Sequence, residues 1–284
     1  MGEAPAMEAL SSYAWLDDRI VSGDELRVSG DDPGFLIGDG IFETMRVRDG
    51  QVVALAAHLA RFERSREALA LPTPATDPAA AIAAVLAATD PGSLVAAGMR
   101  LTLSARPTLI VRLRTLTARD LARRAGLALH TLPERRGESF VARHKTLAWN
   151  ANAIQQRLHA DGADLRFEGL WLDPDGIVLE GTTTNLFAII DGVVLTAPTS
   201  LAILPGIARA QTLAALSGLA IPHREAAFTR ADLDRADAIF ATNALLPLAP
   251  VLTLDGVAIG AAQKQKRPSD VREPLHSLLL RALY

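Results

Sequence analysis

Four of the six Asp-Gly dipeptides, each between two runs that read as β-strands, constrain the fold of this 284-residue chain more than any other feature. They lie at residues 49–50, 175–176, 191–192 and 255–256. Asp-Gly between two β-rich runs is typical of tight hairpins, because both residues accept the left-handed backbone conformation that such turns need. The pattern therefore predicts antiparallel hairpins at all of these positions.

Helical spacing appears between the hairpins. Residues 58–71 place Leu59, Phe62 and Leu69 on one side, and the pattern ends at Pro72. Further helices are expected at 77–88, 150–159 and 207–217, after the N-cap Thr229, and from Ser269 onward. Strands are expected at 13–16, 35–47, 99–104, 108–113, 169–172, 177–179, 186–190 and 238–242.

The order of these elements predicts an α/β fold of the α+β type with two domains. Residues 1–116 are expected to form a smaller N-terminal α/β domain, and residues 126–284 a larger, β-rich C-terminal domain. The Arg-rich stretch 117–125 is interpreted as a connector of low order. A hydrophobic content of 49% can supply full cores for both domains.

Charge and composition exclude several functions. A net charge of -3 gives no basis for binding nucleic acid or an anionic membrane surface. The chain has no cysteine, and no metal site is expected because its histidines lack ligand spacing, at residues 58, 130, 144, 159, 223 and 276. With neither a secretory leader nor an apolar run approaching about 18 residues, cytoplasm is the expected location.

Lysine is rare in this sequence. The 29 Lys and Arg residues include only Lys145, Lys264 and Lys266 as lysines, which leaves 26 arginines. Lys264 and Lys266 lie in a polar run that predicts a solvated loop, whereas Lys145 stands alone. Arginine can replace lysine as a surface charge, but it cannot lose a proton and condense with a carbonyl group. Either Lys145 supplies a reactive amine, or three lysines persist by chance in an arginine-biased sequence.

Several other residues would suit pyridoxal phosphate, which needs an amine for its aldehyde, an anion near its ring nitrogen and donors for its phosphate. Lys145 can supply the amine, and Glu180, between two predicted strands, the carboxylate. Gly206 precedes a predicted helix start at Ile207 and Ala208, where unpaired N–H groups and the helix dipole favour a phosphate.

Arg61 can add a guanidinium fork to the same phosphate. Each of these residues also has an ordinary interpretation. Glu180 would then be an exposed charge at the end of a strand, Gly206 a simple turn, and Arg61 part of a solvated helix face.

The chain resembles the class IV pyridoxal-phosphate enzymes from about residue 35 to residue 251. This family includes branched-chain and D-amino acid aminotransferases and aminodeoxychorismate lyases. Six motifs occur in the family's order, at residues 38–44, 58–65, 144–147, 180–187, 204–209 and 242–245.

The resemblance implies that Lys145 is the Schiff-base lysine and proton carrier, and that Glu180 pairs with the pyridine nitrogen. The other implied cofactor-binding residues are Arg61, Thr183, Thr184, Ile207, Ala208, Asn243 and Ala244. It also implies fold type IV, similar to D-amino acid aminotransferase, with Lys145 on the larger domain and the cofactor between the two domains. The implied assembly is a homodimer.

Within the family, residues 42–47 and 242–247 look most like the aminodeoxychorismate lyases of folate biosynthesis. These enzymes convert 4-amino-4-deoxychorismate to 4-aminobenzoate and pyruvate. The Gly- and Arg-rich loop of many members is missing after Ser104, which leaves Arg106 as a candidate for the substrate carboxylate or as a surface arginine. Phe35 stands where D-amino acid aminotransferases tend to have Tyr.

Two alternatives follow from the same resemblance. The first is an aminotransferase for branched-chain or D-amino acids, in which Lys145 returns the proton that it removes. The second is a catalytically idle relative that acts as a binding protein. In both enzymatic cases the partner is a small, amino-acid-like substrate.

Overall fold

The computed structural model describes residues 13–159 and 164–260, which divide into two compact units. The first unit comprises the described residues up to Thr117 together with His144–Asn150. The second comprises Ala118–Arg143 and the described residues from Ala151 onward. The helix predicted from Ser269 lies outside the described residues. Within those residues, no helix has the length and apolar character needed to span a membrane.

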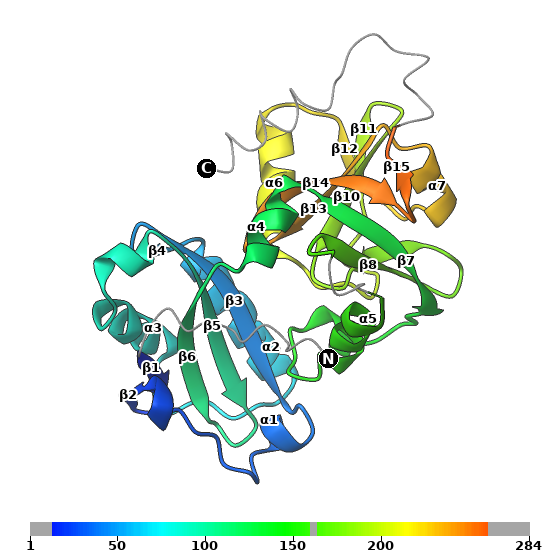
Figure 1. The fold of residues 1–284 in the computed structure, drawn as a ribbon. Coiled ribbons are helices and arrows are strands. Elements are labelled where there is room, and N and C mark those ends of the chain that lie inside the picture. Colours follow the sequence, from blue (N-terminus) through cyan, green and yellow to red (C-terminus); the bar gives the residue numbers. More distant parts are fainter. Residues whose placement is uncertain (1–12, 160–163, 261–284) are drawn as a thin grey trace. The chain divides into compact units, whose positions relative to one another are not determined.

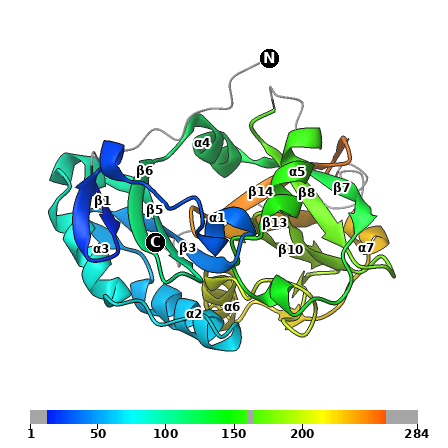
Figure 2. The same ribbon diagram turned by 90° about the horizontal axis from the view of Figure 1, so that it is seen from below.

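The first unit is built on a six-stranded sheet in which all neighbouring strands are antiparallel, in the order β2-β1-β6-β5-β3-β4 (Figure 1). The strands are β1 (Tyr13–Leu16), β2 (Arg19–Ser22), β3 (Gly40–Arg48), β4 (Gln51–Val52), β5 (Ala96–Ser104) and β6 (Leu109–Thr115). Helices α2 (Leu55–Ala68) and α3 (Pro78–Ala87) pack on one face of this sheet (Figure 2).

Buried apolar side chains alternate with other side chains along β3 and β5, so the two faces of this sheet differ. Met45, Val47, Met99 and Leu101 are fully buried in the core that includes α2 and α3. Side chains of a strand alternate between its faces, so the residues between them, such as Arg100, project to the opposite face. The sheet therefore has one apolar face and one face that carries polar side chains.

The hairpin prediction is confirmed in detail at three Asp-Gly turns. At residues 49–50, 191–192 and 255–256, φ is positive at both positions, between 50° and 81°. This is the backbone conformation of type I′ turns. At the fourth turn φ is positive only at Gly176, because Asp173 closes a longer loop by accepting hydrogen bonds from the N–H groups of Asp175 and Ile177.

The strand predicted at 35–47 is wrong in its first part, which is the short helix α1 (Pro33–Leu36). Asp32 caps this helix by accepting a hydrogen bond from the N–H of Gly34 at 2.7 Å, and proline stands at its first position. Strand β3 begins only at Gly40, where φ is 154° and any Cβ would collide with the Leu103 carbonyl oxygen.

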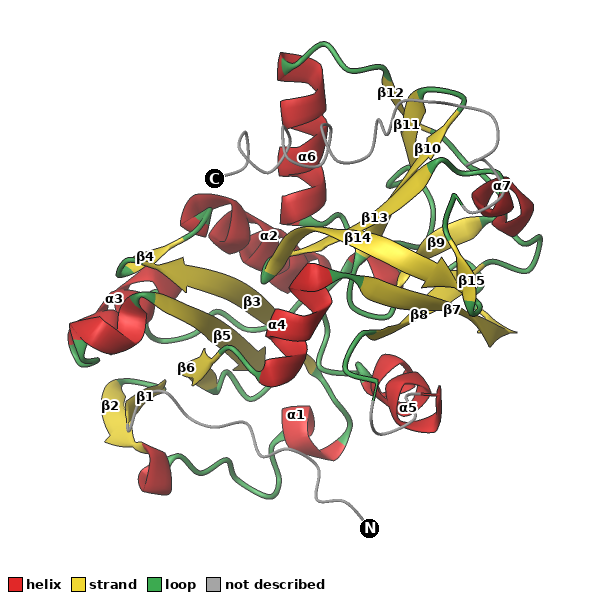
Figure 3. Ribbon diagram, turned by 45° about the horizontal axis from the view of Figure 1, so that its top comes forward, coloured by secondary structure: helices red, strands yellow, loops and turns green. Residues whose placement is uncertain are grey.

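The second unit is built on a nine-stranded sheet in the order β12-β11-β10-β13-β14-β7-β8-β9, with β15 paired to β14 (Figure 3). Its first strands are β7 (Leu127–Arg135), β8 (Phe167–Leu172), β9 (Val178–Gly181), β10 (Asn185–Ile190) and β11 (Val193–Thr196). The others are β12 (His223–Glu225), β13 (Ala238–Asn243), β14 (Leu246–Leu254) and β15 (Val257–Ala258). Its helices include α5 (Asn150–His159), α6 (Ile207–Gly218) and α7 (Arg230–Asp234).

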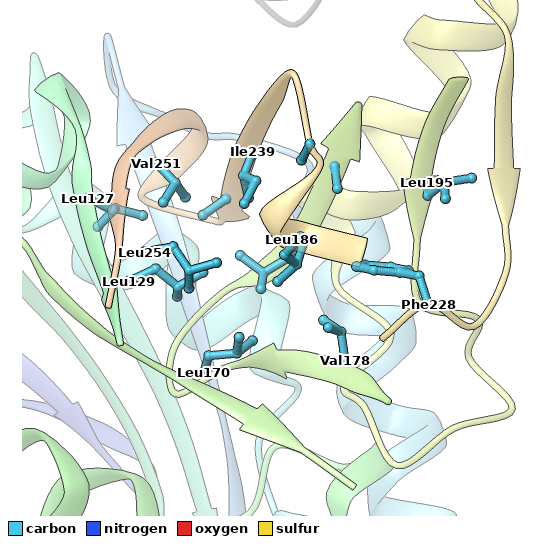
Figure 4. Close-up of a cluster of buried hydrophobic side chains, with 14 of the residues drawn as sticks. Leu127, Leu129, Leu170, Val178, Leu186, Leu195, Phe228, Ile239, Val251 and Leu254 are labelled. Atoms are coloured by element: carbon cyan, nitrogen blue, oxygen red, sulfur yellow. The ribbon is translucent and has the colours of Figure 1, made fainter. Parts of the chain in front are cut away.

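Unlike the first sheet, the second sheet is mixed, with parallel pairs β14–β7, β7–β8 and β11–β12. Strand β7 was not predicted from the sequence, because no short turn joins it to either of its neighbours. Leu127 and Leu129 of β7 lie in the main core of this unit together with Leu170, Leu186 and Val251 (Figure 4). The core therefore depends on a strand that is specified by long-range pairing.

The predicted low-order connector at 117–125 is instead helix α4 (Ala118–Ala125). Its arginines find tertiary partners: Arg123 is 7% exposed and pairs with Glu168, and Arg124 donates to the Leu245 carbonyl oxygen. Because these partners are distant in the sequence, the Arg-rich composition alone did not indicate an ordered helix.

The segment that carries Lys145 groups with the first unit, although the sequence predicted it as part of the C-terminal domain. The reason is main-chain pairing with β3. The Phe42 N–H donates to the Lys145 carbonyl oxygen at 2.8 Å, and the Leu147 N–H donates to the Gly40 carbonyl oxygen at 2.9 Å.

Candidate active site

Lys145 is half-buried, and its main chain is fixed to β3 by the hydrogen bond from Phe42 and a bridge between Thr146 and Ile41. Its Nζ lies 4.6 Å from the centroid of the Phe42 ring. A cation over an aromatic ring is stabilised by the ring quadrupole. The solitary amine is thus held in a defined place on the first unit.

Arg100 contacts the same ring, and the sequence interpretation missed it. Its Cζ lies 3.7 Å from the Phe42 ring centroid, and its Nε donates to Thr102 Oγ1 at 3.2 Å. Burial lowers the pKa of Arg100 to about 10. No carboxylate in the described ranges forms an ion pair with it. The sequence did contain a signal for Arg100, because it lies between Met99 and Leu101 in a predicted strand. Successive side chains of a strand point to opposite faces, so Arg100 had to lie on the face opposite these two apolar residues.

Arg61 is buried, with 5% exposure, so the interpretation as a solvated helix face is wrong. Its Nε and Nη2 donate to the two oxygens of Glu43 at 2.8 and 2.6 Å, and His58 Nδ1 lies 2.8 Å from the same carboxylate. Burial alone would raise the pKa of Glu43, but the hydrogen bonds from His58 and Arg61 outweigh it and lower this pKa to about 2. Glu43 therefore stays ionised and fixes the guanidinium.

The two predicted substrate residues lie on exposed parts of the first unit. Phe35, in α1, is 72% exposed. Arg106 forms an ion pair with Asp31, and both side chains are at least half exposed. Arg106 thus lies where a surface arginine would, which was one of the two interpretations of the sequence. Its role as a ligand of the substrate carboxylate stays a prediction.

Glu180 is buried in the second unit, with 8% exposure, so it is not an exposed charge. Arg136 Nη2 donates to its Oε1 at 2.8 Å. Its Oε2 accepts hydrogen bonds from Asn185 Nδ2 at 3.1 Å and from the Leu204 N–H at 3.0 Å. The carboxylate thus holds the loop that leads into α6.

Helix α6 begins at Ile207, after Gly206 in an extended conformation, and this N-cap glycine has no side chain that could cap the first turn. A Cβ at Gly206 would collide with Asn185 Oδ1, so only glycine allows this approach. The first N–H groups of a helix have no intrahelical acceptor, and they carry the positive end of the dipole. Ile207 and Ala208 thus present main-chain donors that suit an anion.

Strand β13 adds an unusual buried group to this part of the sheet. Thr242 is opposite Asn185 in the register and is 1% exposed, and its hydroxyl has no hydrogen-bond partner among residues 13–159 and 164–260. The following residues form the turn into β14, where Asn243 Oδ1 accepts from the Leu245 N–H at 2.9 Å. Ala244 lies in the same turn.

The hydroxyl groups of Thr183 and Thr184 bind a protein carboxylate. Both donate to Glu168, which is fully buried. Their place in a cofactor site stays a prediction, and their observed role is to shape the turn after Glu180. The sequence interpretation did not single out Glu168.

The residues present fit pyridoxal phosphate. The start of α6 after a glycine N-cap suits a phosphate. The Thr242 hydroxyl, which finds no partner within the described part of the chain, is a buried polar atom that a ligand group could satisfy. Lys145 offers the amine, and Glu180 is a buried carboxylate already set in place by donors.

The comparisons with known proteins agree with this chemistry. The sequence model of amino-transferase class IV matches residues 40–254. A putative branched-chain-amino-acid aminotransferase of Methanocaldococcus jannaschii is 29% identical over 265 residues, which cover 88% of this chain and 90% of that protein. A D-alanine aminotransferase of Bacillus licheniformis is 24% identical over 92% of this chain and 95% of its own length.

Solved structures show the same fold. A hypothetical aminotransferase from Mycobacterium tuberculosis, in a PLP-bound form, has a TM-score of 0.82 and 27% identity, and the match covers 95% of this chain and 98% of that one. A branched-chain aminotransferase of Thermoproteus uzoniensis, 22% identical, also has a TM-score of 0.82, with 95% and 94% covered. These matches confirm the two-domain fold type IV and the resemblance drawn from the motifs. The chain belongs to the class IV aminotransferases, a family of pyridoxal-phosphate-dependent enzymes.

Proposed function

We propose that this enzyme is an aminotransferase for small amino acids of the branched-chain or D-amino acid class. The observation that carries the proposal is that the Lys145 amine and the Arg100 guanidinium share the Phe42 ring. An amine is the group needed for exchange with an amino acid, and a half-buried arginine without a carboxylate partner in the described ranges suits a substrate carboxylate. The names of the two relatives described above support the same substrate classes.

Each proposed residue has one task. Bound pyridoxal phosphate supplies the electron sink that makes the substrate Cα–H acidic. Lys145 Nζ would take the proton from the substrate Cα, hold it, and give it back later in the amino-group transfer. Glu180 keeps the pyridine nitrogen protonated. Arg61, the N–H groups of Ile207 and Ala208, and the turn at Asn243 and Ala244 are the groups that would hold the phosphate.

The lyase reaction, which was preferred from the sequence, is the second candidate. It is favoured by the motifs at residues 42–47 and 242–247, but the comparisons support only the coarser assignment to class IV. In this reaction Lys145 also removes the Cα proton, and the protonated amine then assists the loss of pyruvate.

The proposed assembly is a homodimer in which the partner helps to close the site. Phe35, Leu36 and Ile37 are 72%, 60% and 76% exposed and form a continuous apolar segment. Such exposed apolar surface is typical of protein association.

A substrate panel tests the function. The enzyme with its cofactor is incubated with L-leucine, L-valine or D-alanine, each with 2-oxoglutarate, and separately with aminodeoxychorismate. We expect one amino donor to yield keto acid and glutamate in equal amounts. Aminobenzoate and pyruvate formed without a keto acid would instead establish the lyase, and no product from any substrate would favour the idle relative.

Lys145→Ala is the variant that ties turnover to the amine. We expect it to lower kcat by more than about 10³-fold, because both proton transfers lose their carrier. Lys145→Arg keeps the positive charge and should be equally inactive. Substantial turnover in either variant would contradict the assignment of Lys145.

A further inference from the structure

The turn at 181–184, which follows Glu180, is built around a fully buried carboxylate. Glu168 accepts hydrogen bonds from the Thr183 N–H at 2.7 Å and from Thr184 Oγ1 at 3.0 Å. Arg123 of α4 donates to Glu168 and, at 2.9 Å, to Thr183 Oγ1. A Cβ at Gly181 would collide with the carboxylate, so glycine is required for this close approach.

The neighbouring residue of α4 holds the second turn. Arg124 donates through Nε and Nη2 to the Leu245 carbonyl oxygen, at 3.2 and 3.1 Å. Leu245 follows Asn243 and Ala244 in the turn between β13 and β14. The two turns are also joined directly, because Asn243 Nδ2 donates to the Thr183 carbonyl oxygen at 3.1 Å.

The charge of Glu168 explains why an arginine stands at position 123. A buried carboxylate is costly unless it is paired and hydrogen-bonded, and Arg123 supplies the opposite charge for Glu168. Each terminal nitrogen of a guanidinium carries two N–H groups, so Nη2 of Arg123 binds both Glu168 and Thr183. Removing Arg123 would leave Glu168 buried without a counter-charge and would release the turn above it.

We propose that Arg123, Arg124 and Glu168 are positioning residues for the cofactor, with helix α4 as the common support of both cofactor-binding turns. They act through Thr183 and the turn at 243–245 and do not touch the cofactor themselves. The inference rests on the proposed assignment of these turns to cofactor binding. It gives a function to the Arg-rich stretch that the sequence indicated only as a connector.

Cofactor affinity of the full-length apo-protein tests this inference without any measurement of turnover. The dissociation constant of pyridoxal phosphate is measured by fluorescence titration for wild type, Arg123→Met, Arg124→Met and the double variant. Arg119→Met is the matched control, because Arg119 lies on the same helix and donates to the Phe167 carbonyl oxygen, outside both turns. The rise in Tm on adding cofactor is the second measurement.

We expect each single variant to weaken cofactor binding about tenfold, and the double variant more, with a smaller cofactor-induced rise in Tm. Arg119→Met should change the Tm of the apo-protein but not the dissociation constant. If Arg123→Met does not fold, Arg123→Lys replaces it, because lysine keeps the positive charge but has no planar guanidinium group.

Wild-type affinity in the Arg123 and Arg124 variants would overturn the inference, as would a wild type that binds no cofactor. An equal loss of affinity in Arg119→Met would also overturn it, because it would mean that α4 acts only through overall stability. A wild type that binds cofactor but transaminates no amino acid would refute the proposed function. The cofactor dissociation constants of the variants would still test the role of α4 in that case.

Discussion

Buried carboxylates organise the proposed functional groups in both units, but they do so through different partners. In the first unit, Glu43 accepts hydrogen bonds from the side chains of His58 and Arg61. In the second unit, Glu180 and Glu168 also accept from main-chain N–H groups, those of Leu204 and Thr183. The first arrangement orients a single guanidinium, whereas the second fixes the path of two loops.

The difference matters for the groups that each unit offers to a ligand. The groups proposed for ligand binding in the first unit are side chains, namely those of Lys145, Arg61 and Arg100. The second unit offers main-chain donors at Ile207 and Ala208, whose direction depends on the loop before α6. A substitution should therefore remove one group in the first unit, but it can displace several groups in the second.

The largest effect is expected for Glu43→Gln. The substitution leaves Arg61 buried beside a neutral amide, and breaking a buried ion pair in this way costs about 3–5 kcal/mol of unfolding free energy. Glu63→Gln is the control, because Glu63 forms an exposed pair with Arg66 on the same helix and should cost less than about 1 kcal/mol. Urea unfolding of wild type and the two variants measures the loss of unfolding free energy in each variant. Equal losses in Glu43→Gln and Glu63→Gln would contradict the role of Glu43.

The same variant should change the pH dependence of stability. The pKa of Glu43 is lowered from 4.5 to about 2 in the folded protein, so its ionised form stabilises the fold above pH 4.5. This contribution is lost as the pH falls through about 2, where the folded protein also binds the proton. The difference in unfolding free energy between wild type and Glu43→Gln, measured by urea unfolding at several pH values, should therefore become smaller as the pH falls from 4.5 to about 2.

A smaller effect separates the two arginines of the first unit that are candidates for the substrate carboxylate. Arg100→Met should lower kcat/KM for the amino donor by about 100-fold, mainly through a higher KM, because a charge-assisted hydrogen bond is lost. Arg106→Met should have little effect, because Arg106 is exposed and paired with Asp31. The opposite ranking would restore Arg106 as the carboxylate ligand.

The smallest effect is expected for Ile207→Pro, which removes one main-chain donor of the second unit. Proline is accepted at the first position of a helix, and Gly206 has φ -68° and ψ 139°, a conformation allowed before proline. The cofactor dissociation constant should rise about tenfold. Ile207→Ala keeps the N–H and should bind as wild type does. If both variants bind equally well, the Ile207 N–H does not contact the phosphate.

Local patterns were sufficient for much of the fold. The Asp-Gly turns gave the hairpins correctly, since the left-handed conformation is a property of the turn residues themselves. The N-cap at Thr229 is confirmed by its hydrogen bond from the Asp232 N–H. The start of α6 after Gly206 was likewise predicted, with helix bounds close to those observed.

The amino-acid sequence by itself determined the family, because six short motifs occur along the chain in the family's order. It also predicted the chemical groups of the site, because a lysine, a carboxylate and a helix start can be recognised as residue types at fixed positions. Only the tertiary structure decided which charges are buried and what they bind. Glu43 and Glu168 acquire their roles from residues at least 15 positions away, and β7 acquires its place from parallel neighbours. Burial and long-range pairing arise when distant segments pack, so no local pattern encodes them.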